Sequence, residues 1–195
     1  NEITPRIIEL LKNNKVMAKH LHIPIQSGSN KILKLMNRRY NKEEFLNMVS
    51  NLKEIEDISL TTDLIVGFPK EEENDFSETL NTLKEIGFTK IHTFPYSKRQ
   101  GTPAASMDEQ VLPEIKKKRV HEIISLSNEY ENNFYQSKID KVYDGVVEVH
   151  NNGETIVHTS NFIPVIIKDE ILNNNEIVNV KITKVDGLKV YGKVV

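Results

Sequence analysis

The side chains best suited to chemistry stand where a short apolar run ends. Residues 92–105, HTFPYSKRQGTPAA, pass from that run into a loop that holds hydroxyls, two adjacent cations, a glycine and a proline. Loops at strand ends carry much of the binding and catalysis of α/β proteins. The two cations, Lys98 and Arg99, could bind a phosphate or a carboxylate there. The alternative is a basic loop that is solvated and binds nothing.

A second polar segment follows the apolar run of residues 19–25 and consists of Gln26, Ser27, Gly28 and Ser29. It offers an amide, two hydroxyls and the N–H groups that open the next helix, which suit the carboxylate or the ribose of a bound cofactor. The structural alternative is that Ser29 caps that helix and Gly28 makes the turn. Both roles can hold at once.

Alternation along a strand places further candidates on shared faces. Asp63, Ile65 and Gly67 fall on one face of the run that precedes GFPKE. His20 and His22 share a face of the first run, which raises metal ligation as an alternative. Because no third ligand of matching placement follows, we expect hydrogen-bonded histidines that line the inside of a barrel, and we predict no metal site.

The composition excludes several classes of protein for this chain. The chain has no cysteine, so it can build neither a disulfide nor a Cys-ligated iron–sulfur site. Its net charge of −2 gives no general sign of nucleic-acid binding. No apolar run of membrane-spanning length and no secretory leader occur, so a location away from membranes, in the cytoplasm, is expected. The chain starts with Asn1 directly before a helix signal, which indicates a start in mid-fold.

The elements that position these residues alternate between strand and helix over residues 1–137. Each strand-like run is bounded by Gly or Pro and is followed by a predicted helix. The helix ends carry their own signals: the capping box of Asn41 and Glu44 predicts a start, and Gly87 predicts a stop. Such alternation predicts a parallel sheet of about three β/α units. The expected strands are residues 19–25, 58–66 and 89–95.

A long last helix of this first unit is expected to begin at Pro113. Its first turns carry a basic run, Lys116, Lys117, Lys118 and Arg119. We interpret the run as a solvated helix face, with RNA contact as the alternative.

In residues 138–195 the hydrophobic pattern changes to that of successive strands. Five strand-like runs in this short stretch predict a small closed barrel of the OB kind, because closure removes exposed sheet edges. The overall expectation is an α/β fold, with a partial parallel β/α barrel followed by a five-stranded OB-like β-barrel. The runs are residues 142–150, 156–159, 162–167, 176–184 and 188–195.

The last hairpin of that barrel allows an expectation of register. A three-residue loop over 185–187, with Gly187 left-handed and a bulge, would pair Ile182 with Val190 and keep the apolar residues of both strands on one face. The other face would then carry lysines around a tyrosine, which could hold RNA phosphates and stack on a base. Ordinary edge protection by lysines is the alternative. The residues of this face are Lys181, Lys189, Tyr191 and Lys193.

Three segments together, HLHIPIQSGS at 20–29, TDLIVGFPKE at 62–71 and the loop at 92–105, resemble the radical S-adenosylmethionine tRNA methylthiotransferases. The chain resembles the carboxyl-terminal half of such an enzyme, with 1–137 as part of the radical SAM barrel and 138–195 as a TRAM-like RNA-binding domain. The resemblance implies two kinds of cofactor, S-adenosylmethionine and 4Fe–4S clusters whose cysteine ligands lie outside this chain. It also implies two partners, a tRNA anticodon stem-loop and the missing amino-terminal half.

The resemblance also assigns roles to particular residues. Radical S-adenosylmethionine enzymes carry Gly-x-Ile-x-Gly-x-x-Glu at the second strand, where it supports the adenosine. Here the pattern runs from Asp63, in place of its first Gly, through Ile65 and Gly67, while Glu71 falls one position late and receives no role. Cofactor binding is implied for Gln26, Ser27, Gly28, Ser29 and Tyr96 as well. No catalytic residue is expected in this chain, which alone should be inactive.

The Tyr-Ser-Lys-Arg sequence at residues 96–99 resembles the branch that modifies threonylcarbamoyladenosine, in which Lys98 and Arg99 would suit a tRNA phosphate or the threonyl carboxylate. Enzymes acting on isopentenyl-adenosine tend to read Tyr-Ser-Pro-Arg, and those acting on a ribosomal protein diverge after Tyr-Ser. Both stay open as alternatives. So do a stand-alone RNA-binding module and a different β/α enzyme, although the chain has no phosphate-gripping glycine loop.

Overall fold

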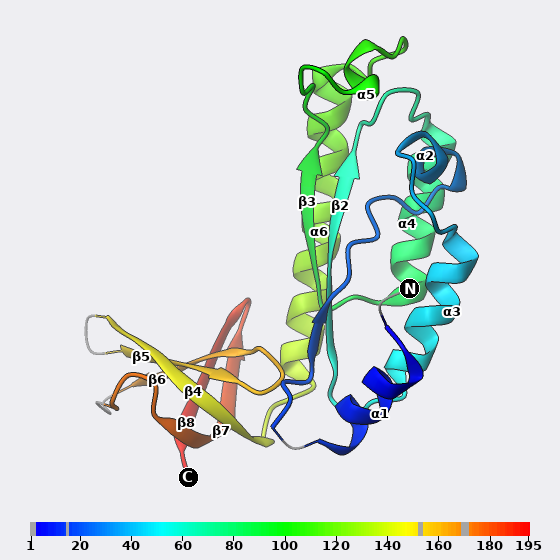
Figure 1. Cartoon of the computed structure of the whole chain (residues 1–195). Helices are drawn as coiled ribbons and strands as arrows, with labels where there is room; N and C mark the ends of the chain where they lie inside the picture. The colour runs from blue at the N-terminus through cyan, green and yellow to red at the C-terminus, as the bar shows by residue number, and fades with distance from the viewer. Residues whose placement is uncertain (1–2, 15, 152–153, 169–171) are drawn as a thin grey trace. The chain divides into compact units, whose positions relative to one another are not determined.

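The computed structural model describes residues 3–14, 16–151, 154–168 and 172–195 (Figure 1). The chain forms two compact units. The sheet unit comprises His22–Glu54 and Leu60–Ser127, and the barrel unit comprises the stretch up to Leu21, Ile55–Ser59 and the chain from Asn128 on. The assignment of 1–137 and 138–195 to two functional domains stays a prediction.

The sheet has three strands, β1 (His20–His22), β2 (Ser59–Val66) and β3 (Lys90–Pro95), in the order β1-β2-β3. Strands β2 and β3 pair in parallel from Thr61 opposite Lys90 to Val66 opposite Pro95. The predicted partial β/α architecture is confirmed, and the strands lie in sequence order. Its strands end together at one edge, where the polar segments of the sequence follow them.

Six helices occur in the described part of the chain, and some of the predicted signals at their ends are present. The capping box of Asn41 and Glu44 is present, and the left-handed Gly87 ends the fourth helix. No helix in the described residues is long and apolar enough to cross a bilayer. The helices are α1 (Pro5–Asn13), α2 (Asn30–Leu35), α3 (Lys42–Lys53), α4 (Glu73–Ile86), α5 (Pro103–Ser106) and α6 (Pro113–Gln136).

Alternation along β2 separates two environments. Leu64 and Val66 are fully buried, whereas Asp63 and Ile65, which alternate with them, are half-exposed. Helices α3 and α4 contact each other alongside the sheet, and α6 is tied to β3 by the Ile91 N–H, which donates to Ser127 Oγ at 2.9 Å (Figure 1). One face of the strands therefore packs into the core, and the opposite face is available for a binding site.

The second set of strands closes into a five-stranded barrel in the order β4-β5-β6-β8-β7, which confirms the predicted closed barrel. The strands are β4 (Val142–Asn151), β5 (Glu154–Thr159), β6 (Pro164–Lys168), β7 (Ile177–Asp186) and β8 (Lys189–Val194). Its buried core consists of Tyr135, Val147, Val157, Ile163, Val165, Ile167, Val180, Ile182, Val185 and Val190.

The register expected for the last hairpin is wrong. Ile182 pairs with Gly192 instead of Val190, and Asp186 pairs with Lys189 across a two-residue turn. Gly187 does adopt a left-handed conformation, with φ of 60°, which suits the first central position of such a turn. The bulge exists but lies between Ile182 and Lys184, where it restores the alignment of the inward residues that the tight turn alone would break.

Candidate functional site

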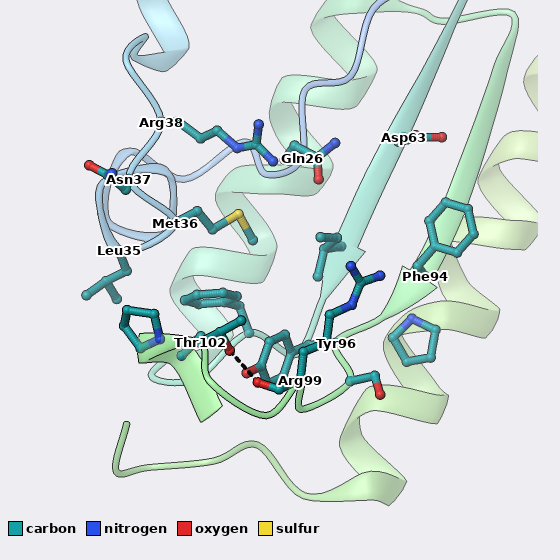
Figure 2. Close-up of a pocket in the computed structure, with 16 residues that line it drawn as sticks. Gln26, Leu35, Met36, Asn37, Arg38, Asp63, Phe94, Tyr96, Arg99 and Thr102 are labelled. Atoms are coloured by element: carbon teal, nitrogen blue, oxygen red, sulfur yellow. Dashed lines mark hydrogen bonds between the residues drawn. The ribbon is translucent and has the colours of Figure 1, made fainter. Parts of the chain in front are cut away.

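A pocket of about 960 Å³ opens where the strands of the sheet unit end (Figure 2). It combines residues of the β1–α2 segment, the α2–α3 connection, β2, β3 and the loop that follows β3. Of the predicted site residues, it brings together Gln26, Asp63, Ile65, Tyr96 and Arg99. The other lining residues are Leu35, Met36, Asn37, Arg38, Phe68, Phe94, Pro95, Ser97, Thr102, Pro103 and Ala104.

Gln26 is fixed by its backbone. Its N–H donates to the Asp63 carbonyl and its carbonyl accepts from the Ile65 N–H, both at 2.9 Å, so the segment continues to pair with β2 beyond β1. Its φ is 64°, a left-handed value that non-glycine residues adopt at a cost of the order of 1 kcal/mol. Such conformations cluster at ligand sites, and here it sets Gln26 in the pocket wall.

The three residues after Gln26 do not line the pocket but are buried against α4. Gly28 N–H donates to Thr79 Oγ1 at 3.1 Å, and Ser29 Oγ donates to Asp75 Oδ1 at 2.8 Å. A Cβ on Gly28 would lie 2.7 Å from the Cα atom of Thr79, so close packing explains the glycine. The structure therefore supports a packing role for Gly28 and Ser29, although Ser29 makes no side-chain cap to α2.

Apolar and aromatic side chains form much of the pocket. Phe68 and Tyr96 meet edge to face, with ring centroids 5.1 Å apart, and Phe94 is half-exposed on β3 next to Ile65 on β2. The Tyr96 hydroxyl is buried and has no hydrogen-bond partner within the described residues. An apolar wall with one unpaired buried hydroxyl fits a nucleoside, whose base is flat and whose polar atoms need partners.

Two guanidinium groups reach this pocket, from Arg38 after α2 and from Arg99 after β3 (Figure 2). Neither forms a salt bridge with a carboxylate among the residues that the structure describes. The Arg99 carbonyl accepts from Thr102 N–H at 3.2 Å and from Thr102 Oγ1 at 2.7 Å, which folds the loop back on itself. Lys98 is exposed and does not line the pocket.

Gly67 does not line the pocket. Glu71, to which no role was assigned, holds the backbone of Gly67 in place. Gly67 is left-handed, with φ of 71°, and its N–H donates to the Glu71 carboxylate. Glu71 in turn accepts a hydrogen bond from Arg119 Nη1 at 3.1 Å, and both side chains are almost completely buried. The sequence pattern, in which Glu71 falls one position late, did not predict this contact.

His22 and Asp63 meet on the exposed face of the sheet. His22 Nε2 lies 3.4 Å from Asp63 Oδ2, and its Nδ1 lies 3.0 Å from Thr61 Oγ1. The His92 ring centroid is 5.8 Å away. No group of three or more metal-ligating side chains forms within the described residues, and His22 takes part in hydrogen bonding.

The candidate RNA face of the barrel has a different arrangement from the one expected. Tyr191 is half-buried and has the Nζ atoms of Lys168 and Lys184 at 5.2 and 6.0 Å from its ring centroid. Lys181 forms an ion pair of 2.8 Å with Asp140, and this hydrogen bond lowers the pKa of that carboxyl. Lys189 and Lys193 are exposed.

Sequence reasoning missed several lining residues, including Met36, Arg38, Phe68 and Phe94. Phe68 and Phe94 adjoin or lie within the segments already singled out, so their place at strand ends was a usable signal. Met36 and Arg38 belong to the connection after α2. Nothing in the local sequence indicates that this connection returns to the sheet edge.

Known proteins resemble this chain over much of its length. The family model described as the radical SAM superfamily matches residues 1–83. The threonylcarbamoyladenosine tRNA methylthiotransferase of Bacillus subtilis is 40% identical over 190 residues, with 94% of this chain and 42% of that protein covered. The tRNA-2-methylthio-N(6)-dimethylallyladenosine synthase of Clostridium tetani is 43% identical over 192 residues, with 94% and 41% covered. The chain thus spans less than half the length of these relatives.

Solved structures show the same fold at low identity. Coproporphyrinogen III oxidase of Escherichia coli, described as a radical SAM enzyme, superimposes with a TM-score of 0.56 at 15% identity, covering 94% of this chain and 44% of that one. An amino-terminally truncated Elp3 of Methanocaldococcus infernus gives a TM-score of 0.50 at 15% identity, covering 79% and 49%.

Proposed function

Because the chain belongs to the radical SAM tRNA methylthiotransferase family, we propose that it is the carboxyl-terminal half of an enzyme that adds a 2-methylthio group to N6-threonylcarbamoyladenosine beside the tRNA anticodon. The observation that carries the proposal is the pocket at the strand ends. Gln26 after β1, Ile65 on β2, and Tyr96 and Arg99 in the loop after β3 converge there from three separate segments. Ligands of parallel α/β folds bind at this end of the sheet.

In this proposal the pocket holds part of S-adenosylmethionine, which supplies the radical chemistry of the superfamily when it is bound to a reduced 4Fe–4S cluster. Ile65 offers an apolar surface for the adenine, and the Tyr96 hydroxyl and the Gln26 amide offer hydrogen bonds to polar atoms. The chain has no cysteine. The thiolates that hold a cluster therefore have to come from outside these 195 residues.

The substrate side of the proposal rests on the loop after β3. Arg99 lies in the pocket wall without a carboxylate partner in the described residues, and it would bind a phosphate next to the target nucleoside. Lys98 stands where enzymes that act on isopentenyl-adenosine tend to have a proline. We assign to Lys98 the binding of the threonyl carboxylate. The relatives are named for both nucleosides, so the choice of branch depends on Lys98.

The barrel would hold the anticodon stem-loop. Tyr191 offers a ring for base stacking, and the lysines near it offer charges for phosphates. Lys168 and Lys184 join the candidates because their Nζ atoms lie near the Tyr191 ring. The full set proposed for RNA contact is Lys98, Arg99, Lys168, Lys181, Lys184, Lys189, Tyr191 and Lys193.

We expect Lys98→Pro to lower kcat/KM about tenfold for tRNA that carries threonylcarbamoyladenosine, because one charge-assisted hydrogen bond is lost. For tRNA with isopentenyl-adenosine, which has no carboxylate, kcat/KM should not fall. The measurement is methylthiolation by the longer protein that carries this sequence, with both tRNAs.

Two further variants make the test specific. Lys98→Gln keeps the backbone free and should show the same selective loss, whereas Arg99→Gln should weaken both substrates, since a phosphate is common to them. Equal losses on both tRNAs for Lys98→Gln would show that Lys98 binds no carboxylate. No loss with any of the three variants would identify a solvated loop.

A further inference from the structure

The basic run at the start of α6 divides into two kinds of residue. Lys117 and Lys118 are exposed, as a solvated helix face requires. Arg119 is only 4% exposed, and Lys116 is half-buried. For these two residues the expectation of a solvated helix face is wrong. Their side chains contact the ends of β2 and β3, next to the pocket.

Arg119 secures the end of β2. Its Nη1 donates to the Glu71 carbonyl at 3.2 Å and to Glu71 Oε2 at 3.1 Å, and its Nη2 donates to Glu73 Oε2 at 3.2 Å. The Glu71 carboxylate also accepts the Gly67 N–H. The turn from β2 into α4 is therefore tied to α6 by charge-assisted hydrogen bonds.

Lys116 secures the end of β3. Its Nζ donates to the Tyr96 carbonyl at 3.0 Å and lies 5.1 Å from the centroid of the Tyr96 ring. Its aliphatic stem occupies the space beside Gly67, where an added Cβ would collide with it. Burial, and then the charge of Lys98, lower the pKa of Lys116. A desolvated ammonium group interacts strongly with a carbonyl and an aromatic face.

The contacts of Lys116 involve Tyr96 and the residue before Phe68, and these two aromatic residues form one wall of the pocket. Tyr96 N–H donates to the Val66 carbonyl at 2.8 Å, so the residue extends the pairing of β3 with β2. The Tyr96 ring then packs edge to face on Phe68. Lys116 contacts both the carbonyl and the ring of Tyr96, and its stem fills the space at Gly67, directly before Phe68.

We infer that Lys116 is a positioning residue for the pocket: through Tyr96 and Phe68 it holds the aromatic wall in the arrangement that binds the nucleoside part of the cofactor. Arg119 gives the same support to the β2 end through Glu71. The inference about cofactor binding rests on the proposed function. The contacts of Lys116 themselves do not.

The test compares Lys116→Met with Lys117→Met in the longer protein that carries this sequence. Methionine keeps an aliphatic stem against Gly67 and removes the ammonium. Equilibrium dialysis with S-adenosylhomocysteine, which needs no reduction, gives the dissociation constant. We expect it to rise about fivefold for Lys116→Met, the effect of one lost hydrogen bond, and to stay unchanged for the exposed Lys117→Met. Lys116→Arg should restore most of the affinity.

Hydrogen exchange without ligand separates two kinds of failure. If Lys116 positions Tyr96, the Tyr96 amide should exchange faster in Lys116→Met and not in Lys117→Met. If the unaltered protein fails to bind S-adenosylhomocysteine while this change is seen, the proposed function is refuted and the positioning contact stands. A lower melting temperature with unchanged affinity and unchanged Tyr96 exchange would overturn the inference.

Discussion

Arg119→Met is expected to lower the free energy of unfolding by about 3–5 kcal/mol, because it leaves a buried carboxylate without its partner. The exposed fractions of the Arg119 and Glu71 side chains are 5% and 1%, so water cannot replace the guanidinium. Urea denaturation at neutral pH measures the loss. Lys117→Met, on the exposed side of α6, is the matched control and should change stability by less than about 0.5 kcal/mol.

The pH dependence of this loss identifies its cause. Burial raises the pKa of Glu71 above its usual value, although Arg119 and the Gly67 N–H oppose the shift. The folded state therefore binds this proton more tightly than the unfolded state. Its contribution to stability is complete below the unfolded pKa of about 4.5 and is lost as pH rises through the folded value.

Removal of Arg119 removes the opposing charge and raises the pKa of Glu71 further. The deficit of Arg119→Met relative to the parent protein should be smallest in acid and should grow as pH rises through the folded-state pKa of Glu71 in the parent, which lies above about 4.5. Glu71→Gln combined with Arg119→Met should recover part of the loss, since no ionised group stays buried. Parallel stability curves across pH for the parent and Arg119→Met would contradict this account.

Asp57→Asn is expected to have the second large effect, about 2–4 kcal/mol, in the barrel unit. Asp57 accepts hydrogen bonds from Lys138 Nζ at 2.6 Å, Lys141 Nζ at 3.1 Å and Tyr143 Oη at 3.1 Å. The Lys138 side chain is only 9% exposed. Asparagine tolerates the left-handed backbone of residue 57, whose φ is 59°, so the change tests the charge and not the backbone.

The three donors of Asp57 differ in exposure, which supplies a control. Lys141 is 45% exposed, so Lys141→Met should cost about 1 kcal/mol or less. Although burial acts to raise it, hydrogen bonds from Lys138 and then Lys141 hold the pKa of Asp57 below its usual value. The stabilisation is therefore present above about pH 3.8 and is lost as pH falls. If denaturation at pH 7 gave equal free energies of unfolding for Asp57→Asn and Lys141→Met, the role of Lys138 would be disproved.

The local elements could be read from the sequence because their signals lie within a few residues. The capping box of Asn41 and Glu44 and the stop at Gly87 are of this kind. The pattern predicted Asn74 or Asp75 as the cap of α4, two or three residues late: the cap is Glu72, and the Asp75 carboxylate accepts the Glu72 N–H from inside the first turn. The hairpin register failed for a related reason, since two combinations of turn and bulge align the same apolar residues and only packing selects one.

The candidate site was predictable where it depends on strand ends. Alternation placed Ile65 and the position after the first strand placed Gln26, because parallel strands end at one edge of the sheet, whereas Tyr96 was implied by the family resemblance. Arg38 and Lys116 could not be found in this way. Each belongs to an element outside the sheet. The local sequence does not show which lysine or arginine of such an element the fold places at a strand end.

The most direct test of the proposed function is the place where S-adenosylhomocysteine binds in the longer protein that carries this sequence. A crystal structure of that complex should show the adenosine in the pocket, within contact distance of Ile65 and Tyr96 and with a polar atom hydrogen-bonded to Gln26. A ligand bound elsewhere, with Gln26, Ile65 and Tyr96 untouched, would contradict the account.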